Sequence, residues 1–180
     1  MTKKKNLEPP NYIASNRLNS PRKKESLALT QLLLAHPTFK SAKSIGITYS
    51  GALEVETSLI IQAAWRKGKR VYLPKTLPNR QMAFIEHTAK DELVLSSFGV
   101  PEPRYEERRV NNEVDLMIVP GIGFATDSHY RIGFGGGYYD RFLAHYPGQT
   151  VALVPTAMQF ATAEWQIEPF DIPIQELILA

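Results

Sequence analysis

The sequence lacks two features that define large classes of protein: it has no cysteine and no long apolar run. The absence of cysteine excludes disulfide scaffolds, thiolate zinc sites and cysteine nucleophiles. No apolar run approaches the roughly 18 residues that a membrane-spanning helix needs. The basic first residues are not followed by the apolar segment of a secretory signal. We therefore expect a cytoplasmic protein that acts without a membrane.

Positive charge is concentrated in the first part of the chain. Residues 1–25 contain seven Lys or Arg and two Glu, a net charge of +5, so the remainder carries −2 of the total of +3. Such a basic arm is either a solvated tail or a segment that meets an anionic ligand, for example a nucleotide phosphate. Nucleic acid is not an expected partner, because no basic stripe with interleaved aromatic residues continues into the rest of the chain.

The length and the apolar content indicate one folded unit. The 180 residues fall within the usual size of a domain, roughly 100–200 residues. Apolar residues make up 43% of the sequence, which is enough for a full core, so folding only on binding is not expected. We predict a single domain over residues 1–180, of which residues 1–20 form a basic arm.

The first half of the chain predicts one helix followed by a strand–helix–strand unit. A hydroxyl cap and a proline at residues 20–21 begin a helix that ends at Ala35, before His36-Pro37. Residues 44–49 predict a short buried strand, 55–67 a helix closed by Gly68, and 70–73 a second strand that Pro74 stops. Such a unit pairs its strands in parallel.

The second half continues the alternation. Residues 81–87 predict an added strand, and residues 114–119 predict the clearest buried strand, which opens into a long loop through Gly137. A helix is expected from Tyr138 to about Tyr146, followed by strands at residues 150–154 and 175–179. The pattern indicates an α/β fold, a three-layer α/β/α domain with a mostly parallel sheet. Ligands in such folds lie beyond the carboxyl ends of the parallel strands, and the long loop begins at such an end.

The long loop contains the segment with the clearest chemistry, Arg131-Ile-Gly-Phe-Gly-Gly-Gly-Tyr-Tyr-Asp140-Arg141. Four glycines in five positions are costly to order, and they make sense where backbone N–H groups must approach a ligand. The start of the following helix and the two arginines add positive charge. These features predict a phosphate site, although a glycine-rich turn without a ligand is the alternative.

The segment matches neither of the two best-known nucleotide motifs. It has no Gly-Lys-Ser/Thr, so it is not a Walker A loop, and it does not follow its strand directly as a dinucleotide fingerprint does. Asp140, at the start of the expected helix, is either a partner for the helix dipole or a ligand for Mg²⁺, which takes one or two carboxylates on a nucleotide.

The same segment resembles the ATP loop of the 5-formyltetrahydrofolate cyclo-ligases, also called methenyltetrahydrofolate synthetases. Other segments resemble that family in the same order along the chain, and together they cover most of it: Glu54-Val-Glu-Thr57, Gly68-Lys-Arg-Val-Tyr-Leu-Pro-Lys75, Glu102-Pro103, Asp115 through Gly121, Gln159, and Glu168-Pro-Phe-Asp171. The resemblance implies an enzyme that converts 5-formyltetrahydrofolate to 5,10-methenyltetrahydrofolate with ATP and Mg²⁺ and releases ADP and phosphate. It implies small-molecule partners only, a reduced folate and ATP, and we expect a monomer.

The resemblance also implies roles for individual residues. Tyr139 and Arg131 are the expected catalytic residues, and Asp140 and Asp171 the expected Mg²⁺ ligands. The expected substrate-binding residues are Tyr49, Glu54 and Met82. The expected ATP-binding residues are Lys3, Lys4, Arg131, Ile132, Gly133, Phe134, Gly135, Gly136, Gly137, Tyr138 and Tyr139.

Several of these residues have a second interpretation that the sequence leaves open. Met82 and its neighbour Phe84 suit either an apolar wall for the folate or plain core packing. Lys75 suits either a phosphate contact or a solvated surface. Glu54 suits either a hydrogen bond to the pterin or a helix N-terminal acid.

Three positions depart from the family pattern. The N-terminal Lys residues are followed by Leu7-Glu8-Pro9-Pro10 instead of a helical segment with an Arg. His129 stands where the family usually has a glycine, two residues before Arg131. Phe170 stands where a histidine often precedes the second aspartate. None of the four histidines has metal-ligand spacing, and only His129 lies beside the expected ATP loop.

Two other functions remain open at this point. One is an ATP-dependent enzyme that uses a different acceptor on the same scaffold. The other is a protein that binds a nucleotide or a folate without turnover.

Overall fold

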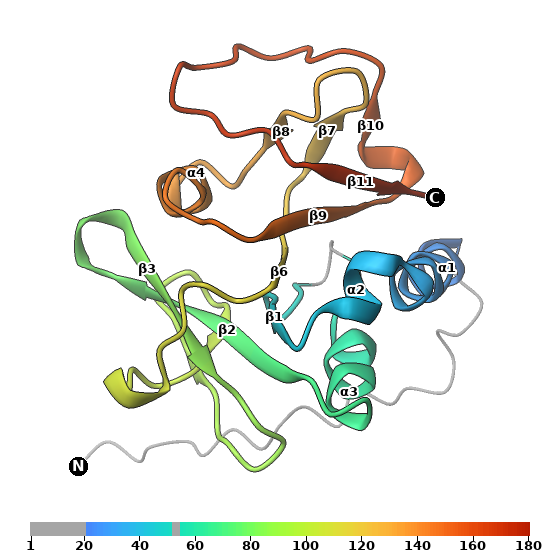
Figure 1. Cartoon of the computed structure of the whole chain (residues 1–180). Helices are drawn as coiled ribbons and strands as arrows, with labels where there is room; N and C mark the ends of the chain where they lie inside the picture. The colour runs from blue at the N-terminus through green and yellow to red at the C-terminus, as the bar shows by residue number, and fades with distance from the viewer. Residues whose placement is uncertain (1–20, 52–54) are drawn as a thin grey trace.

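The fold is built on a six-stranded sheet. The structure is a computed structural model and describes residues 21–51 and 55–180. The strands follow the order β11-β9-β6-β1-β2-β3 across the sheet (Figure 1). Their bounds are β1 Ser44–Gly46, β2 Arg70–Leu77, β3 Gln81–Glu86, β6 Leu116–Ile118, β9 Gln149–Val154 and β11 Glu176–Leu179. Five of these strands pair in parallel, and only β3 runs antiparallel, against β2.

Helices cover both faces of this sheet. Helices α1 (Pro21–Ala35), α2 (Pro37–Ser41) and α3 (Ser58–Arg66) lie on one side, and α4 (Tyr138–Leu143) lies on the other (Figure 1). Successive residues of each strand alternate between two buried apolar clusters. Val71, Leu73 and Leu116 pack with α1 and α3, whereas Tyr72 and Met117 pack with α4. The predicted α/β fold, with three layers and a mostly parallel sheet in one domain, is confirmed.

The helices on the first face match the helices predicted from the sequence, and the short helix α2 is the one addition. The predicted helix at residues 21–35 ends where expected, because His36 takes an extended conformation before Pro37. The ring of His36 then accepts a hydrogen bond from the N–H of Thr38, and Pro37 begins the short helix α2. Helix α3 begins three residues later than predicted.

The prediction that Pro74 stops the second strand is wrong. Strand β2 continues to Leu77 and pairs with β3 through the register Pro74↔Phe84. The N–H and C=O of Phe84 bond to Asn112 and Asn111 instead of to β2. The Pro74–Phe84 pair is therefore a non-hydrogen-bonded pair of the ladder, at which a proline removes no bond between the strands.

The segment predicted as one long loop, from Pro120 to Gly137, contains two short strands. β7 (Gly123–Ala125) pairs with β8 (Arg131–Ile132) and with β10 (Gln159–Phe160) to form a separate small sheet. A second small ribbon joins β4 (Val94–Leu95) to β5 (Pro101–Glu102). Three turns of 3₁₀ helix complete the fold: η1 Pro78–Arg80, η2 Glu107–Arg109 and η3 Thr156–Met158.

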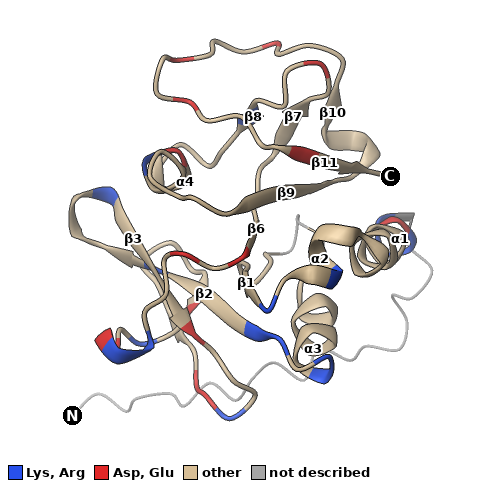
Figure 2. Cartoon of the chain, viewed as in Figure 1, with Lys and Arg blue, Asp and Glu red and all other residues tan. Residues whose placement is uncertain are grey.

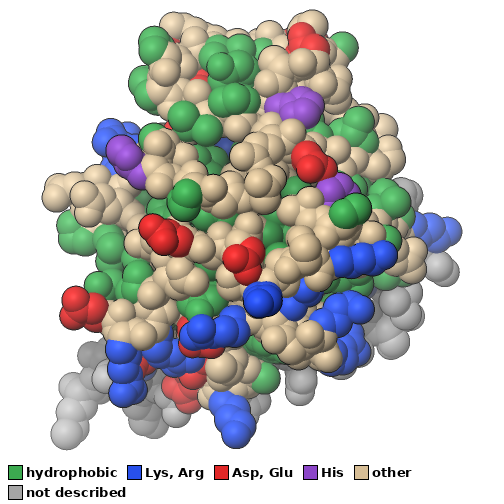
Figure 3. All heavy atoms as spheres, viewed as in Figure 1, with side chains coloured by type: hydrophobic (Ala, Val, Ile, Leu, Met, Phe, Trp, Pro, Cys, Tyr) green, Lys and Arg blue, Asp and Glu red, His purple; other side chains and the backbone are tan. Residues whose placement is uncertain are grey.

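Charge is distributed unevenly over the described chain. Lys and Arg side chains gather near the start of β2, the end of α3 and the turn η2, while the region of the small β7–β8–β10 sheet carries few of them (Figure 2). One face of the molecule shows the same contrast, with blue side chains collected in its lower part (Figure 3). No helix in the described part of the chain is long and apolar enough to cross a membrane.

Candidate functional site

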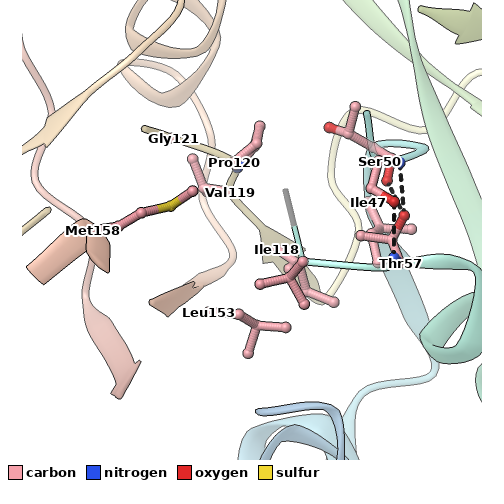
Figure 4. A pocket seen from close by; sticks show the side chains of 11 residues that line it. Ile47, Ser50, Thr57, Ile118, Val119, Pro120, Gly121, Leu153 and Met158 are labelled. Atoms are coloured by element: carbon pink, nitrogen blue, oxygen red, sulfur yellow. Dashed lines mark hydrogen bonds between the residues drawn. The ribbon is translucent and has the colours of Figure 1, made fainter. Parts of the chain in front are cut away.

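The candidate site lies at the carboxyl edge of the parallel strands. A pocket opens there between the ends of β1, β6 and β9 (Figure 4). Its lining is mostly apolar, with hydroxyl groups from Thr48, Ser50 and Thr57 on one side. Parallel α/β sheets bind ligands at this edge, so the pocket lies where the fold predicts a site.

The polar side of the pocket is held by a local hydrogen-bond clamp. The N–H of Ser50 donates to Oγ1 of Thr57 at 2.9 Å, and the N–H of Thr57 donates to Oγ of Ser50 at 3.1 Å (Figure 4). Oγ1 of Thr57 also donates to the carbonyl of Thr48 at 2.7 Å. These bonds fix both ends of the connection between β1 and α3.

The glycine-rich segment links β8 to α4 beside this edge. Gly135 and Gly137 have φ angles of 88° and 68°, in the left-handed region that glycine adopts without strain. Gly133 and Gly136 are needed for space instead. An added Cβ would lie 2.7 Å from Nη1 of Arg131 at the first position and 2.7 Å from the ring of Tyr138 at the second. The backbone conformation therefore favours glycine at Gly135 and Gly137, whereas a side chain at Gly133 or Gly136 would require Arg131 or Tyr138 to move.

The helix after this segment is shorter than predicted. α4 spans six residues and ends at Leu143, whereas the sequence predicted a helix to about Tyr146. The phenol of Tyr146 donates to the carbonyl of Val114 at 2.6 Å, which holds this turn against the start of β6. Because α4 has only six residues, we expect the positive charge at the site to come mainly from arginine and less from a helix dipole.

Arg131 is buried beside the glycine segment. Its side chain is 4% exposed, and Nη2 lies 3.6 Å from Oδ2 of Asp140. The guanidinium stands 5.5 Å from the ring centre of Tyr139. Burial lowers the pKa of Arg131, and the nearby Asp140, Tyr139 and Asp171 oppose that shift, so the group stays charged. Its Nε is buried and has no hydrogen-bond partner among the described residues.

The two predicted metal ligands lie in the same electrostatic environment, and each already makes a backbone contact. Oδ1 of Asp140 accepts the N–H of Ile172 at 3.1 Å, and Oδ2 of Asp171 accepts the N–H of Glu168 at 2.9 Å. Within residues 21–51 and 55–180, no group of three or more His, Asp or Glu is arranged to hold a metal ion by itself.

Tyr139 connects the glycine segment to the central sheet. Its phenol oxygen lies 2.6 Å from Oγ1 of Thr48, which follows β1 and lines the pocket. Thr48 was missed by sequence reasoning, because it is 91 residues away from its partner and belongs to no motif. Its place near the carboxyl end of the strand predicted at residues 44–49 was the available signal.

Two of the predicted folate-binding residues, Tyr49 and Met82, pack in different apolar clusters. Tyr49 packs against the core on the α1 and α3 face, while its neighbours Thr48 and Ser50 line the pocket. Met82 and Phe84 are buried in the cluster on the α4 face, which fits core packing. Their substrate contacts stay predictions. Glu54, Lys3 and Lys4 lie outside the described residues.

Lys75 has an ion-pair partner that the sequence did not predict. Its Nζ lies 2.9 Å from Oε2 of Glu102, a carboxylate that also accepts a hydrogen bond from the hydroxyl of Thr76. The Glu102 side chain is 4% exposed and that of Lys75 is 23% exposed, so this is a partly buried ion pair at the junction of β2 and β5. Lys75 therefore has a structural partner in the absence of any ligand.

His129, one of the departures from the family pattern, has a structural explanation. Its φ is 62°, a left-handed conformation that explains why a glycine suits this position. Its Nδ1 lies 2.9 Å from the carbonyl of Ile174, and its own carbonyl accepts the N–H of Ile174 at 3.0 Å. The imidazole thus bonds to the segment before β11.

Comparisons with known proteins agree on one family. The profile of the 5-formyltetrahydrofolate cyclo-ligase family matches residues 5–179. A mouse protein named 5-formyltetrahydrofolate cyclo-ligase is 34% identical over 163 residues, which cover 86% of this chain and 78% of the relative. The Escherichia coli K12 protein of the same name is 29% identical over 153 residues, covering 81% of this chain and 82% of the relative.

A solved structure gives the same result. The NMR structure of an Aquifex aeolicus 5,10-methenyltetrahydrofolate synthetase superposes with a TM-score of 0.75 at 30% sequence identity. The superposition covers 88% of this chain and 79% of the other. Sequence and structure therefore confirm the predicted resemblance, and the chain belongs to the 5-formyltetrahydrofolate cyclo-ligase family.

Proposed function

We propose that the protein converts 5-formyltetrahydrofolate to 5,10-methenyltetrahydrofolate with ATP and Mg²⁺, and releases ADP and phosphate. The observation that carries the proposal is the family match over residues 5–179, which includes the complete glycine segment and its flanking arginines. The site adds independent support, because a buried guanidinium, a glycine-rich connection and a pocket lie together at the carboxyl edge of the sheet.

The proposed chemistry explains why the enzyme would need a phosphoryl donor. A formamide oxygen is a poor leaving group, so transfer of the γ-phosphoryl group of ATP onto it activates the formyl carbon as an imidoyl phosphate. The N10 nitrogen of the folate then attacks that carbon, the C–N bond closes the ring, and phosphate leaves with the oxygen. Phosphoryl transfer of this kind requires mostly positioning and charge neutralisation.

The glycine segment and Arg131 would bind the phosphates. Four of the five residues 133–137 are glycines, so no side chain of theirs would block a phosphate that approaches their N–H groups. The buried Nε of Arg131 has no bond within the described chain, and buried donors of this kind are normally satisfied. A phosphate oxygen would satisfy it, and the guanidinium would neutralise charge that develops during transfer.

The residues present fit Mg²⁺ on a nucleotide better than a metal held by protein alone. Asp140 lies 3.6 Å from Arg131 and bonds to the N–H of Ile172, the residue after Asp171, so both carboxylates belong to segments beside the proposed phosphate site. Two carboxylates are the usual protein contribution to Mg²⁺ on a nucleotide, which otherwise keeps water and phosphate ligands. When bound there, Mg²⁺ would neutralise the phosphate charge.

Tyr139 would face the reacting end of the folate. Its ring lies next to Arg131, and its hydroxyl reaches the end of β1 beside the pocket. This hydroxyl would orient the formyl group close to the phosphates. The mostly apolar pocket would exclude water from that region.

The test is an absorbance assay for the methenyl product with Mg-ATP and 5-formyltetrahydrofolate. The proposal predicts product that depends on ATP, with one ADP formed per turnover. Product formed without ATP, or no product with it, would contradict the proposal. ADP formed only with another acceptor would identify a different ligase. Calorimetric binding with no ADP formed would identify a binding protein without turnover.

Two further expectations belong to the proposal and remain predictions. One is a cytoplasmic location, and the other is a monomeric state. Size-exclusion chromatography with light scattering would test the second, because a mass near 20.3 kDa is expected.

A further inference from the structure

Thr48 makes a contact that ties the end of β1 to the glycine segment across the site. Its Oγ1 lies 2.6 Å from the phenol oxygen of Tyr139, a normal hydrogen-bond length for two hydroxyl groups. The contact is partly buried and joins residues 91 positions apart. A hydrogen bond in this setting is worth more than one in water, and it restricts the rotation of the phenol.

The backbone that carries the Thr48 hydroxyl is held by hydrogen bonds. The carbonyl of Thr48 accepts a 2.7 Å hydrogen bond from Thr57, whose own N–H and Oγ1 are engaged with Ser50. β1 is a central strand, with β6 on one side and β2 on the other. A hydroxyl fixed in this way can hold a partner within a small range of positions.

Tyr139, at the other end of the contact, lies next to the residues that are proposed to bind phosphate and metal. The ring of Tyr139 lies 5.5 Å from the Arg131 guanidinium, whose Nη2 is 3.6 Å from Asp140. Fixing the phenol therefore fixes the surface against which the guanidinium packs. Among the described residues, Thr48 makes no hydrogen bond to either charged group, so its influence on them passes through Tyr139.

We propose that Thr48 is a positioning residue, which holds the Tyr139 hydroxyl and ring in the orientation that the reaction uses. This inference rests on the proposed cyclo-ligase function. It goes beyond that function because it assigns a role to a side chain outside the glycine segment and outside every motif that identified the family.

The first test is a double-mutant cycle with Thr48→Val and Tyr139→Phe. Valine keeps the branched shape of threonine and removes the hydroxyl. Loss of one hydrogen bond to a partly buried phenol predicts about a fivefold fall in kcat. The KM for ATP should stay within about twofold, because the phosphate groups are not contacted. Thr48→Ser keeps a hydroxyl and should restore most of the rate.

The cycle separates positioning from general destabilisation. In a Tyr139→Phe background, Thr48→Val should have no further effect on kcat, because the shared contact is already lost. Equal losses in both backgrounds, or a Thr48→Ser variant as slow as Thr48→Val, would overturn the proposal. Thr30→Val is the matched control, since Thr30 is buried and, among the residues that the structure describes, its hydroxyl bonds to the carbonyl of Ser26 in α1. It should leave kcat unchanged.

A second measurement does not depend on turnover. Protein with ¹³C at the ζ carbon of tyrosine gives one resonance for each of its eight tyrosines, and Tyr139→Phe identifies the one from Tyr139. Thr48→Val should shift that resonance, and Thr30→Val should not. A wild-type protein without activity but with this shift would refute the cyclo-ligase function and keep the contact. An unmoved resonance would refute the role of Thr48 whatever the activity.

Discussion

Two charged side chains near opposite ends of the parallel strands have different surroundings. At the amino edge, Oδ2 of Asp115 accepts hydrogen bonds from the N–H groups of Lys43 and Ser44 at 2.8 and 2.9 Å, and from the Ser44 hydroxyl at 3.1 Å. At the carboxyl edge, Arg131 has one ion pair at 3.6 Å and a buried Nε with no bond in the described chain. The carboxylate of Asp115 has hydrogen-bond partners within the protein, whereas a buried donor of the Arg131 guanidinium has none in the described chain.

The difference distinguishes structural from functional charge. Burial alone would raise the pKa of Asp115, but the Lys43 and Ser44 hydrogen bonds outweigh it and hold that pKa below its usual value. Asp115 thereby joins the starts of β1 and β6. Arg131 is buried without an equivalent set of partners, which lowers the stability of the fold. Such an arrangement is typical of a group that binds a ligand.

The largest expected effect comes from Arg131→Ala. Removal of a buried cation from the proposed phosphate site should lower kcat/KM for ATP by about 100-fold or more. Stability should fall too, because the side chain packs against Gly133 and Tyr139, but by a smaller factor. Steady-state kinetics and urea unfolding measure the two effects. Comparable losses in both would mark Arg131 as a structural arginine.

Arg109→Ala is the control for that comparison. Arg109 has a complete partner, since its Nη1 and Nη2 bond to the two carboxylate oxygens of Asp91 at 3.1 and 2.5 Å. Arg109 also holds the pKa of Asp91 far below its usual range through that hydrogen bond. The variant should lose stability and keep the kcat of the folded enzyme.

Asp115→Ala should produce the converse result at the amino edge. Three donors lose their acceptor, so the free energy of unfolding should fall by about 2 kcal/mol in urea titrations. The kcat per folded molecule should not change. Glu113→Ala, at an exposed position in the same turn, should alter neither quantity. A large loss of kcat in Asp115→Ala would contradict the assignment of this edge to structure.

Asp140→Asn tests the proposed metal ligand with little change in shape. Asparagine keeps the carbonyl-type oxygen that accepts the N–H of Ile172, and it loses the negative charge. The Mg²⁺ concentration needed for half-maximal rate should rise about 10-fold. Asp127→Asn, which changes an exposed carboxylate, is the control. An unchanged Mg²⁺ titration would remove Asp140 from the metal site.

The smallest expected effect concerns His87, which lies beside the start of β2 on the structural side of the comparison. Burial lowers the pKa of His87, which also packs its ring near Trp65. The unfolded chain then binds the proton more readily than the folded one, so stability is lost as pH falls below about 6.5.

Thermal melting at about pH 7.5 and about pH 5.5 measures this loss. His87→Gln cannot take up the proton and should show a smaller decrease in Tm between the two pH values. A decrease equal to that of the wild type would assign the acid sensitivity to other groups.

Local patterns in the sequence predicted most of the fold. Apolar runs located β6 and β9, and the strand–helix–strand unit located β1, α3 and β2. The passage of β2 through Pro74 could not be predicted, because it depends on which pairs of the β2–β3 ladder are hydrogen-bonded. Strands β7 and β8 are too short to have a period, and they exist because residues far apart in the chain pair with them.

The site was predictable only where the chain is continuous. The glycine segment and Asp140 are neighbours in sequence, so their proximity needed no fold. Thr48 and Tyr139 meet only because the sheet brings the end of β1 close to α4. A threonine and a tyrosine at these positions do not by themselves predict the contact. The ion pair of Lys75 with Glu102 was missed for the same reason.

The most direct test is a crystal structure of the protein with an ATP analogue and Mg²⁺. The account predicts phosphate oxygens on the N–H groups of residues 133–137, a hydrogen bond to Nε of Arg131, and the metal at Asp140. Nucleotide bound elsewhere, with Arg131 still unsatisfied beside an empty glycine segment, would contradict it.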